Sequence, residues 1–128
     1  MAVVKSKKKS VVVTSTCNAY VNTSFNNIII TITNINGDTI CWSTGGKVGF
    51  KNAKKKNTVY AAQVVAEDSA KLALENGVKN INVIVKGVGI GRETAIRTLA
   101  DKGLQLLSIT DRTSVPHGGC RPKKIRRN

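Results

Sequence analysis

The sequence predicts an α/β fold, in which a five-stranded mixed sheet and two helices follow one another in β-β-β-α-β-α-β order. In several stretches rich in Val, Ile and Thr, residues alternate with a period of two between one face and the other, which is typical of strands. Two other stretches place small and apolar residues at helical spacing. Each helical stretch lies between two strands, so each helix is expected to cross over a face of the sheet.

The first two strands come from β-branched and apolar runs near the beginning of the chain. Val11–Val13 and Ala19–Val21 indicate a first strand, which we expect to be irregular around Ser15–Asn18. Ile28–Thr33 consists entirely of Ile and Thr, residues whose stiff, branched side chains pack well on a pleated surface. This run predicts the second strand.

A hairpin turn is expected directly after the second strand. Asn36-Gly37 is the residue pair preferred in a type I′ turn, because both central residues of that turn need positive φ. Thr39–Thr44 then predicts a third strand that returns antiparallel to the second.

The first helix is expected over Thr58–Asn76, which is rich in Ala. Asn57 or Thr58 can cap its first turn, and Gly77 can adopt the left-handed conformation that ends a helix. The side chains that form the predicted buried stripe are Ala61, Val65, Ser69 and either Leu72 or Ala73.

The last part of the domain repeats the alternation of strand and helix. Apolar residues alternate over Ile81–Val85 and predict the fourth strand. Arg92–Lys102 predicts the second helix, with Gly103 as its stop, and Leu104–Thr110 predicts the fifth strand.

The positive charge is concentrated outside this body. The chain carries 21 Lys and Arg against 7 Asp and Glu, a net charge of +14. Residues 45–60 and 112–128 carry +5 and +6 with no acid, and residues 1–10 carry +4, whereas residues 61–111 are neutral. We therefore predict a basic N-terminal arm (1–10), an α/β RNA-binding domain (11–111) with a basic loop (45–57), and a basic C-terminal tail (112–128). Acid-free segments of this kind indicate a polyanionic partner, because Lys and Arg displace the counterions of phosphate groups.

Several classes of protein are excluded by what the sequence lacks. Three cysteines without a CxxC motif argue against a disulfide framework and favour a reducing compartment. No apolar run reaches the roughly 20 residues that span a bilayer, so no membrane role is expected. His117 and Cys120 form half of a zinc motif without a second half, so no metal is expected. The seven acids are scattered, which argues against an enzyme.

A glycine-rich segment precedes the second predicted helix. Gly87, Gly89 and Gly91 lie between Lys86 and Arg92. Backbone N–H groups at such a helix N-terminus can bind an anion, so the segment is either a phosphate contact to RNA or a tight turn. Arg92 occupies the position of the last glycine in a dinucleotide fingerprint, so no nucleotide cofactor is expected.

The basic loop carries an aromatic residue among its lysines. Phe50 lies in a segment that holds five Lys residues. Its ring can stack on an unpaired base, or it can anchor the loop on the core.

Six stretches, in order from about Ser24 to Arg127, resemble the universal small-ribosomal-subunit protein eleven family in its bacterial and organellar form. The stretches are Ser24–Thr33, Gly45–Lys51, Ala61–Gln63, Val85–Glu93, Ile109–Thr113 and Pro116–Lys124. Val88 and Ile90 depart from the family pattern, which usually has Pro at both positions.

The resemblance implies a ribonuclease-H-like topology without catalysis. It implies a structural constituent of the small ribosomal subunit that binds the central domain of the rRNA on the platform, near the exit-site mRNA path. Neighbouring platform proteins and head protein seven are implied as partners, and no homo-oligomer is expected. The expected rRNA-binding residues are Lys7, Lys8, Lys9, Asn26, Asn27, Lys47, Lys51, Lys54, Lys55, Lys56, Lys86, Gly87, Gly89, Gly91, Arg92, His117, Arg121, Lys123, Lys124, Arg126 and Arg127.

The amino-acid composition also indicates the source of the gene. Lys exceeds Arg, and Asn and Ile are abundant, which indicates an AT-rich gene. With no transit peptide recognised, we predict a plastid-encoded protein, with the cytoplasm of an AT-rich bacterium as the alternative.

The alternative function is that of a free nucleic-acid-binding factor, such as a chaperone or a DNA-compacting protein. Such a factor would share the positive charge but would bind nucleic acid without fixed stoichiometry.

Overall fold

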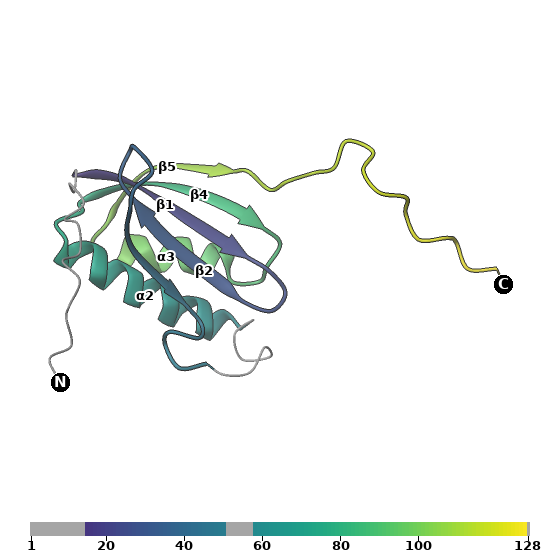
Figure 1. Ribbon diagram of the computed structural model, residues 1–128. Coiled ribbons are helices and arrows are strands. Elements are labelled where there is room, and N and C mark those ends of the chain that lie inside the picture. The colour runs from purple at the N-terminus through teal and green to yellow at the C-terminus, as the bar shows by residue number, and fades with distance from the viewer. Residues whose placement is uncertain (1–14, 51–57, 128) are drawn as a thin grey trace, which may run out of the picture.

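The computed structural model describes residues 15–50 and 58–127. One five-stranded sheet forms the first layer, and two helices packed on one of its faces form the second (Figure 1). The elements are β1 (Thr16–Thr23), β2 (Ile28–Thr33), β3 (Thr39–Thr44), α2 (Val59–Glu75), β4 (Asn80–Gly87), α3 (Arg92–Asp101) and β5 (Gln105–Asp111). The predicted fold class and element order are confirmed.

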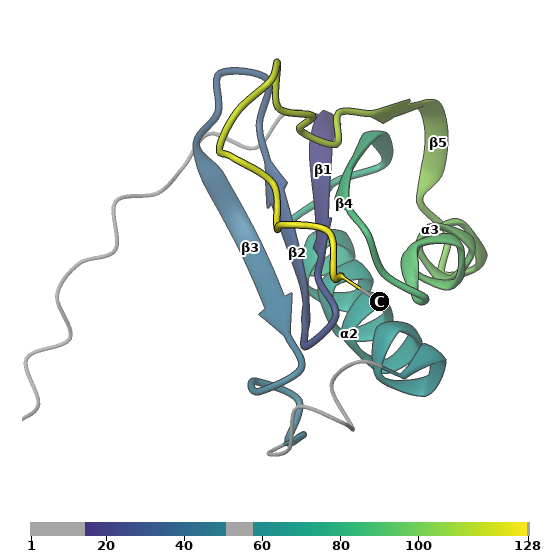
Figure 2. The same cartoon turned by 90° about the vertical axis from the view of Figure 1, so that its right-hand side faces the viewer.

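The strands lie in the order β3-β2-β1-β4-β5. β2 is antiparallel to β1 and to β3, whereas β4 is parallel to β1 and to β5. Parallel neighbours need a crossover connection, and α2 and α3 supply the two crossovers. Figure 2 shows both helices on the same side of the sheet. This is the ribonuclease-H-like topology that the family resemblance implies.

The core lies between the sheet and the two helices, and α2 contributes the larger share of the helical core residues. Every second residue of β1, β2 and β4 points into it, for example Val21, Ile30 and Val83, which are fully buried. The predicted stripe of α2 is confirmed, since Ala61, Val65, Ser69 and Ala73 are all buried. Most of these helix residues are small, so α2 can approach the sheet closely.

The caps of α2 follow the sequence prediction. The Thr58 hydroxyl accepts a hydrogen bond from the backbone N–H of Ala61 at 3.1 Å, and this fixes the start of the helix. Gly77 has a φ of +88° directly after the C-cap Asn76. Because α2 begins at a capped residue, the chain that leaves the basic loop enters the fold at a defined point.

Two local predictions are wrong. The first strand is regular rather than irregular at its start, because parallel pairing with β4 begins at Thr16 and continues without a shift to Thr23. Val11–Val13 lies outside the described residues. The hairpin is not type I′, because among the described residues only glycines have positive φ, and Asn36 is therefore excluded.

The hairpin loop is instead held by Asn34. The Asn34 carbonyl accepts from the Gly37 N–H at 3.1 Å, and the Asn34 side-chain oxygen accepts from the Asp38 N–H at 3.0 Å. One register shift in the β2–β3 pairing, next to Thr33, takes up the extra residue. The buried Asn34 side chain thus decides a turn that the Asn-Gly pair alone predicts differently.

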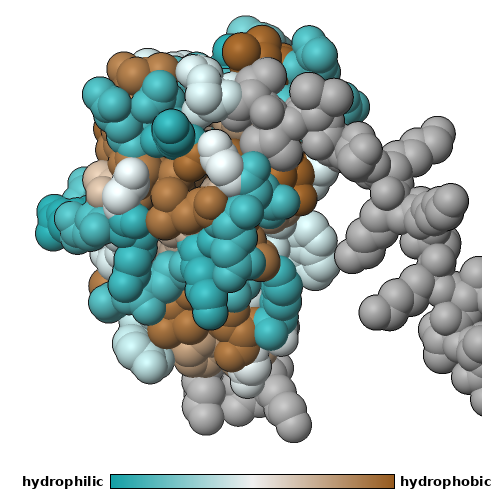
Figure 3. Space-filling view, turned by 90° about the vertical axis from the view of Figure 1, so that its left-hand side faces the viewer, coloured by the Kyte–Doolittle hydropathy of each residue, from teal (hydrophilic) through white to brown (hydrophobic). Residues whose placement is uncertain are grey.

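Neither α2 nor α3 is long and apolar enough to cross a bilayer. On the face seen in Figure 3, hydrophobic side chains form small areas separated by hydrophilic ones. The C-terminal segment leaves β5 and runs away from the body (Figure 1).

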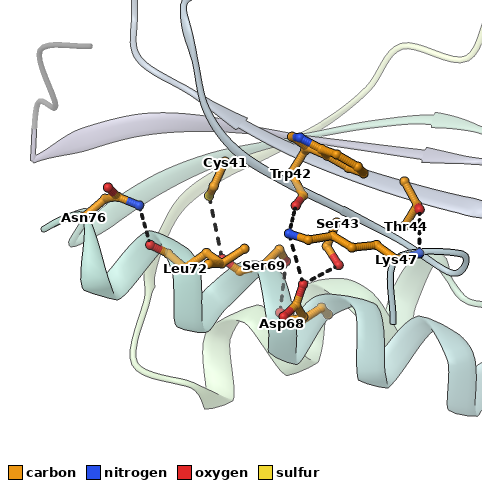
Figure 4. Close-up of polar contacts among 10 residues, drawn as sticks. Cys41, Trp42, Ser43, Thr44, Lys47, Asp68, Ser69, Leu72 and Asn76 are labelled. Carbon is orange, nitrogen blue, oxygen red and sulfur yellow. Dashed lines mark hydrogen bonds and ion pairs between the residues drawn. The ribbon is translucent and has the colours of Figure 1, made fainter. Parts of the chain in front are cut away.

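The three cysteines lie in different environments. Cys17 and Cys41 are buried, whereas Cys120 is exposed in the tail. Burial raises the pKa of the Cys41 thiol to about 11, against an opposing effect of Lys47. The Cys41 thiol also lies 3.9 Å from the Ser69 carbonyl oxygen, to which it donates (Figure 4).

We expect one fast-reacting thiol in the folded protein. Iodoacetamide at pH 8 should modify Cys120 at the rate of a free thiol, and Cys17 and Cys41 at least about 100-fold more slowly, because modification requires an exposed thiolate. Peptide mapping after timed quenching gives the three rates. Equal rates in denaturant serve as the control, and fast modification of Cys41 in the native protein would contradict the packing described.

Candidate nucleic-acid interface

The glycine-rich segment packs tightly against the end of β1 and the start of α2. Gly87 has a φ of +101°, and a side chain there would overlap the carbonyl oxygen of Thr23. A Cβ at Gly89 would lie 2.7 Å from the Thr23 Cβ, and a Cβ at Gly91 would overlap the Ala62 side chain. All three glycines therefore have a packing reason to be glycine. The tight-turn interpretation is sufficient for them, and it does not exclude a phosphate contact.

A small hollow lies where these elements meet. Its volume is about 10 Å³, room for one water molecule, and its lining includes Thr23, Asn27, Gly89 and Gly91. The Thr23 hydroxyl is buried there and has no hydrogen-bond partner among the described residues. The hollow is too small for a phosphate group, so backbone phosphates can contact only its rim.

The connection between β1 and β2 presents Asn26 to solvent. Ser24 closes this turn, because its N–H donates to the Asn27 carbonyl at 2.9 Å and its hydroxyl accepts from the N–H of Asn27 at 3.2 Å. The Asn27 side-chain oxygen is used internally, since it accepts from the Ile28 N–H at 2.9 Å. Of the two predicted asparagines, Asn26 is the exposed one.

Arg92 joins the glycine segment to the beginning of the tail. One guanidinium nitrogen lies 3.1 Å from the Gly87 carbonyl oxygen, to which it donates, and 3.3 Å from an Asp111 carboxylate oxygen. Asp111 in turn accepts from the hydroxyl of Thr113 at 2.6 Å and from its backbone N–H at 2.9 Å. Arg92 therefore has a structural role that the sequence prediction of an RNA contact did not include, and three of its five N–H donors remain for a ligand.

These contacts lower the pKa of the Asp111 carboxyl below its ordinary value of 3.8. The Thr113 hydroxyl contributes most, followed by the Thr113 backbone N–H, and Arg92 adds a smaller effect. The carboxylate is therefore ionised in the whole neutral range, and it holds Thr113 and Arg92 together at the root of the tail.

Lys47 is also engaged within the protein. Its ammonium donates to the Trp42 carbonyl at 2.8 Å, lies 3.5 Å from an Asp68 carboxylate oxygen and stands 5.1 Å from the centre of the Trp42 ring (Figure 4). The same Asp68 oxygen accepts from the Ser43 hydroxyl at 2.7 Å. Lys47 thus ties the start of the basic loop to β3 and α2.

The sequence left two roles open for Phe50, base stacking and anchoring of the loop, and its contacts support anchoring. Its ring meets the Tyr60 ring edge to face, with 6.0 Å between the centroids. The contact fastens the described end of the basic loop to the first turn of α2. A base can stack on Phe50 only where this contact leaves the ring free.

The basic residues of the tail are exposed to solvent and form no ion pair within the described part of the chain. No helix or strand is assigned in residues 112–127, and no described acid pairs with a tail base. The backbone N–H of Arg112 donates to the Val85 carbonyl at 2.8 Å and extends the β4–β5 pairing by one residue. The exposed predicted residues are His117, Arg121, Lys123, Lys124, Arg126 and Arg127.

The structure brings some predicted residues together and not others. Asn27, Gly89 and Gly91 surround the small hollow, and Gly87 contacts Arg92, whereas Lys86 is paired with Asn22 on the sheet. Lys47 lies elsewhere, at the edge strand β3. Seven predicted lysines lie outside the described residues, namely Lys7, Lys8, Lys9, Lys51, Lys54, Lys55 and Lys56.

Sequence reasoning missed Asp111 and Thr113 as the residues that fix the root of the tail. The signal was present, because an Asp followed two residues later by Thr is able to form a local turn through its carboxylate. No group of His, Cys, Asp and Glu in residues 15–50 and 58–127 is arranged to hold a metal ion.

Known proteins similar to this chain are small-subunit ribosomal proteins. The family model described as Ribosomal protein S11 matches residues 17–127. The chain is 52% identical over 127 residues to "Small ribosomal subunit protein uS11" of Flavobacterium johnsoniae, with 99% of each chain covered. It is 50% identical over 121 residues to the protein of the same name from Porphyromonas gingivalis, with 94% of each covered. Both relatives are bacterial, so they do not support the predicted plastid origin.

Replacing Gly87 with Ala should destabilise the fold more than replacing Gly77. Both glycines have positive φ, but only Gly87 would place the new methyl group against backbone, at Thr23. We expect the Gly87→Ala variant to lose at least about 2 kcal/mol more unfolding free energy than Gly77→Ala, the typical cost of forced overpacking. Urea unfolding curves at one temperature measure both, and equal losses would show that only φ matters at these positions.

Asp111 should titrate below pH 3.8. Because its pKa is lower in the folded state than in the unfolded state, its contribution to stability is present above pH 3.8 and is lost as the pH falls through the folded pKa. The Thr113→Val variant should move the titration back toward 3.8, since it removes the hydroxyl donor. Carbon-detected NMR of the carboxyl group measures both midpoints, and an unchanged midpoint in the variant would refute the hydrogen bond as the cause.

Proposed function

The chain belongs to the ribosomal protein S11 family, and we propose that it fastens segments of small-subunit rRNA to one another through its exposed basic segments. It is a component of the small ribosomal subunit and a structural protein, not an enzyme. The family comparison thus supports the expectation that this chain serves translation without catalysis.

The distribution of charge carries the proposal. Five of the seven acids lie on α2 and α3, namely Glu67, Asp68, Glu75, Glu93 and Asp101. The tail holds six bases and no acid, and its described residues lie in solvent. Neutralising rRNA phosphates with such residues releases counterions, so binding is strong and depends on salt.

The predicted residues divide into contacts and supports. We propose that Lys86, Asn26 and the tail residues His117, Arg121, Lys123, Lys124, Arg126 and Arg127 contact rRNA directly, together with the lysines of the arm and loop. Arg92 and Lys47 hold the tail root and the loop in place, and their remaining donors face the RNA. Gly87, Gly89 and Gly91 let the backbone pass close to β1, so that the same segment can present its N–H groups at the rim of the hollow.

The finer placement rests on the family. We propose that the chain binds the central domain of the rRNA on the platform, near the exit-site mRNA path, with other platform proteins and head protein seven as neighbours. The bacterial relatives favour ribosomes of a bacterial cytoplasm as its location. The AT-rich coding sequence inferred from the Lys, Asn and Ile content is equally compatible with a bacterium.

A sedimentation experiment tests the proposal against a free nucleic-acid-binding factor. The tagged protein from its native source should co-migrate with the small subunit in a sucrose gradient at one copy per subunit, and should remain there after a high-salt wash. Migration at the top of the gradient, or salt-sensitive spreading over all nucleic acid, would favour the free factor.

The tail should account for part of the salt dependence of rRNA binding. Replacing Arg126 and Arg127 with Gln should lower the slope of log affinity against log salt by about 2 for two lost phosphate contacts. The matched control replaces Lys71 and Arg97 with Gln, which removes the same charge from α2 and α3 and should leave the slope nearly unchanged. Filter binding to a central-domain rRNA transcript measures the slopes, and equal slopes for the two variants would count against the tail as a phosphate contact.

The basic loop should contribute to the same salt dependence. Replacing Lys54, Lys55 and Lys56 with Ala should also lower the slope of log affinity against log salt, and an unchanged slope would count against the loop as a phosphate contact.

A further inference from the structure

The face of the sheet that points away from α2 and α3 is covered by no helix of the described chain. Strand pairing places one residue of every strand in a single row across this open face. The row is Trp42, Thr31, Tyr20, Ile84 and Thr110, from β3 to β5. Their strand neighbours, such as Cys41 and Val21, point into the core instead.

Two aromatic rings stand in this row. Trp42 is 49% exposed, and Tyr20 is half-buried. They lie on strands β3 and β1, with Thr31 of β2 between them, so their Cα atoms are about 10 Å apart. The small Thr31 side chain leaves both rings accessible from the same side.

Polar groups flank the rings, and among them only Lys86 is charged. Asn18 pairs with Asn82 in the next row, and Asn82 accepts from the Ser108 hydroxyl at 3.1 Å. Asn22 pairs with Lys86 on the other side of the aromatic row. The amide groups can donate to and accept from base edges, and Lys86 can meet a phosphate.

The open face carries no carboxylate among the described strand residues. Asp111 is the only acid within a strand, and it pairs with Val85, whose side chain points toward the helices. The helices that hold five acids lie on the opposite side of the sheet. The protein is therefore polarised, and a polyanion is repelled less by the open face than by the helical face.

The environment of Trp42 adds a cation to the ring. In Figure 4 the indole extends away from α2, whereas Cys41 and Ser43 of the same strand turn toward it. The Lys47 ammonium stands 5.1 Å from the ring centre. A base that stacks on Trp42 would thus lie close to a positive charge.

We propose that this open face is a stacking platform for unpaired rRNA nucleotides. One base stacks on Trp42 and another on Tyr20, the Asn side chains contact base edges, and Lys86 faces the phosphates. Single-stranded RNA is recognised on other sheets in this way, because aromatic rings accept any base. The inference rests on the proposed rRNA-binding function and adds to it a surface of the sheet, apart from the tail and the glycine segment.

Trp42 is the single tryptophan of the chain and reports directly on the platform. A single-stranded RNA of mixed sequence, about eight nucleotides long, should quench its fluorescence in a saturable way at physiological salt. The same sequence as a duplex should quench it far less, because its bases are already stacked. Saturable quenching by the single strand supports the platform, and its absence would overturn it.

Tyr20 provides a matched pair of variants that keep the fold. Tyr20→Phe retains the ring and should bind the single strand as the unchanged protein does. Tyr20→Leu keeps an apolar side chain but loses the π-face, and should bind about 10-fold more weakly, the effect of one lost base stack. Leu74→Ala, which removes an exposed apolar side chain near the end of α2, is the control and should change binding by less than about 2-fold. Thermal unfolding checks that all variants are folded, and equal affinities for Phe and Leu would refute stacking.

Reconstituted small subunits separate this inference from the function on which it rests. Subunits with Tyr20→Leu should keep one copy of the protein, held by its basic segments, but one or two unpaired rRNA nucleotides should become reactive to a ribose-acylating probe. If the variant subunits show unchanged rRNA reactivity, or instead lose a neighbouring protein, the platform is refuted and the rRNA-binding function stands. If the unchanged protein fails to enter subunits at all, the proposed function itself fails.

Discussion

The close approach of Gly87 to the Thr23 backbone is the constraint on which the arrangement of this molecule depends. Thr23 and Gly87 are the last paired residues of the parallel strands β1 and β4. Because Gly87 has no side chain, β4 can stay paired to its end and then turn sharply into α3. That turn places Arg92 against the Gly87 carbonyl and against Asp111, where the tail begins. Sheet, helix and tail are thus joined at one point.

The basic residues fall into two groups with different physical roles. Lys47 and Arg92 lie beside carboxylates and backbone carbonyls of the same chain, so part of their bonding capacity stabilises the protein. The tail bases lie in solvent, and no described acid forms an ion pair with them. Surface ion pairs contribute little to stability, about 0–1 kcal/mol. The main effect of the Lys47 and Arg92 ion pairs is to fix where the loop and the tail leave the body. These two points determine which positions the exposed bases can reach.

The two faces of the sheet differ in the acids that they present. The helices cover one face and carry most of the acids, whereas the open face presents Trp42, Tyr20 and uncharged amides. For the proposed RNA contact, the neutral body needs no large positive potential. It needs a face without acids, and the parallel crossovers provide one because both helices lie on the other side of the sheet.

The sequence by itself determined the elements, because periodicity and caps are local signals. Ile28–Thr33, the capped start of α2 at Thr58 and the stops at Gly77 and Gly103 were all predictable from neighbouring residues. The tertiary structure alone decided the rest. Asn34 overrode the Asn-Gly turn signal, pairing with β4 made β1 regular, and Arg92 and Lys47 found partners distant in sequence. The alignment of Trp42 with Tyr20 depends on strand register, which the burial of one sheet face and the Asn34 turn with its bulge set together.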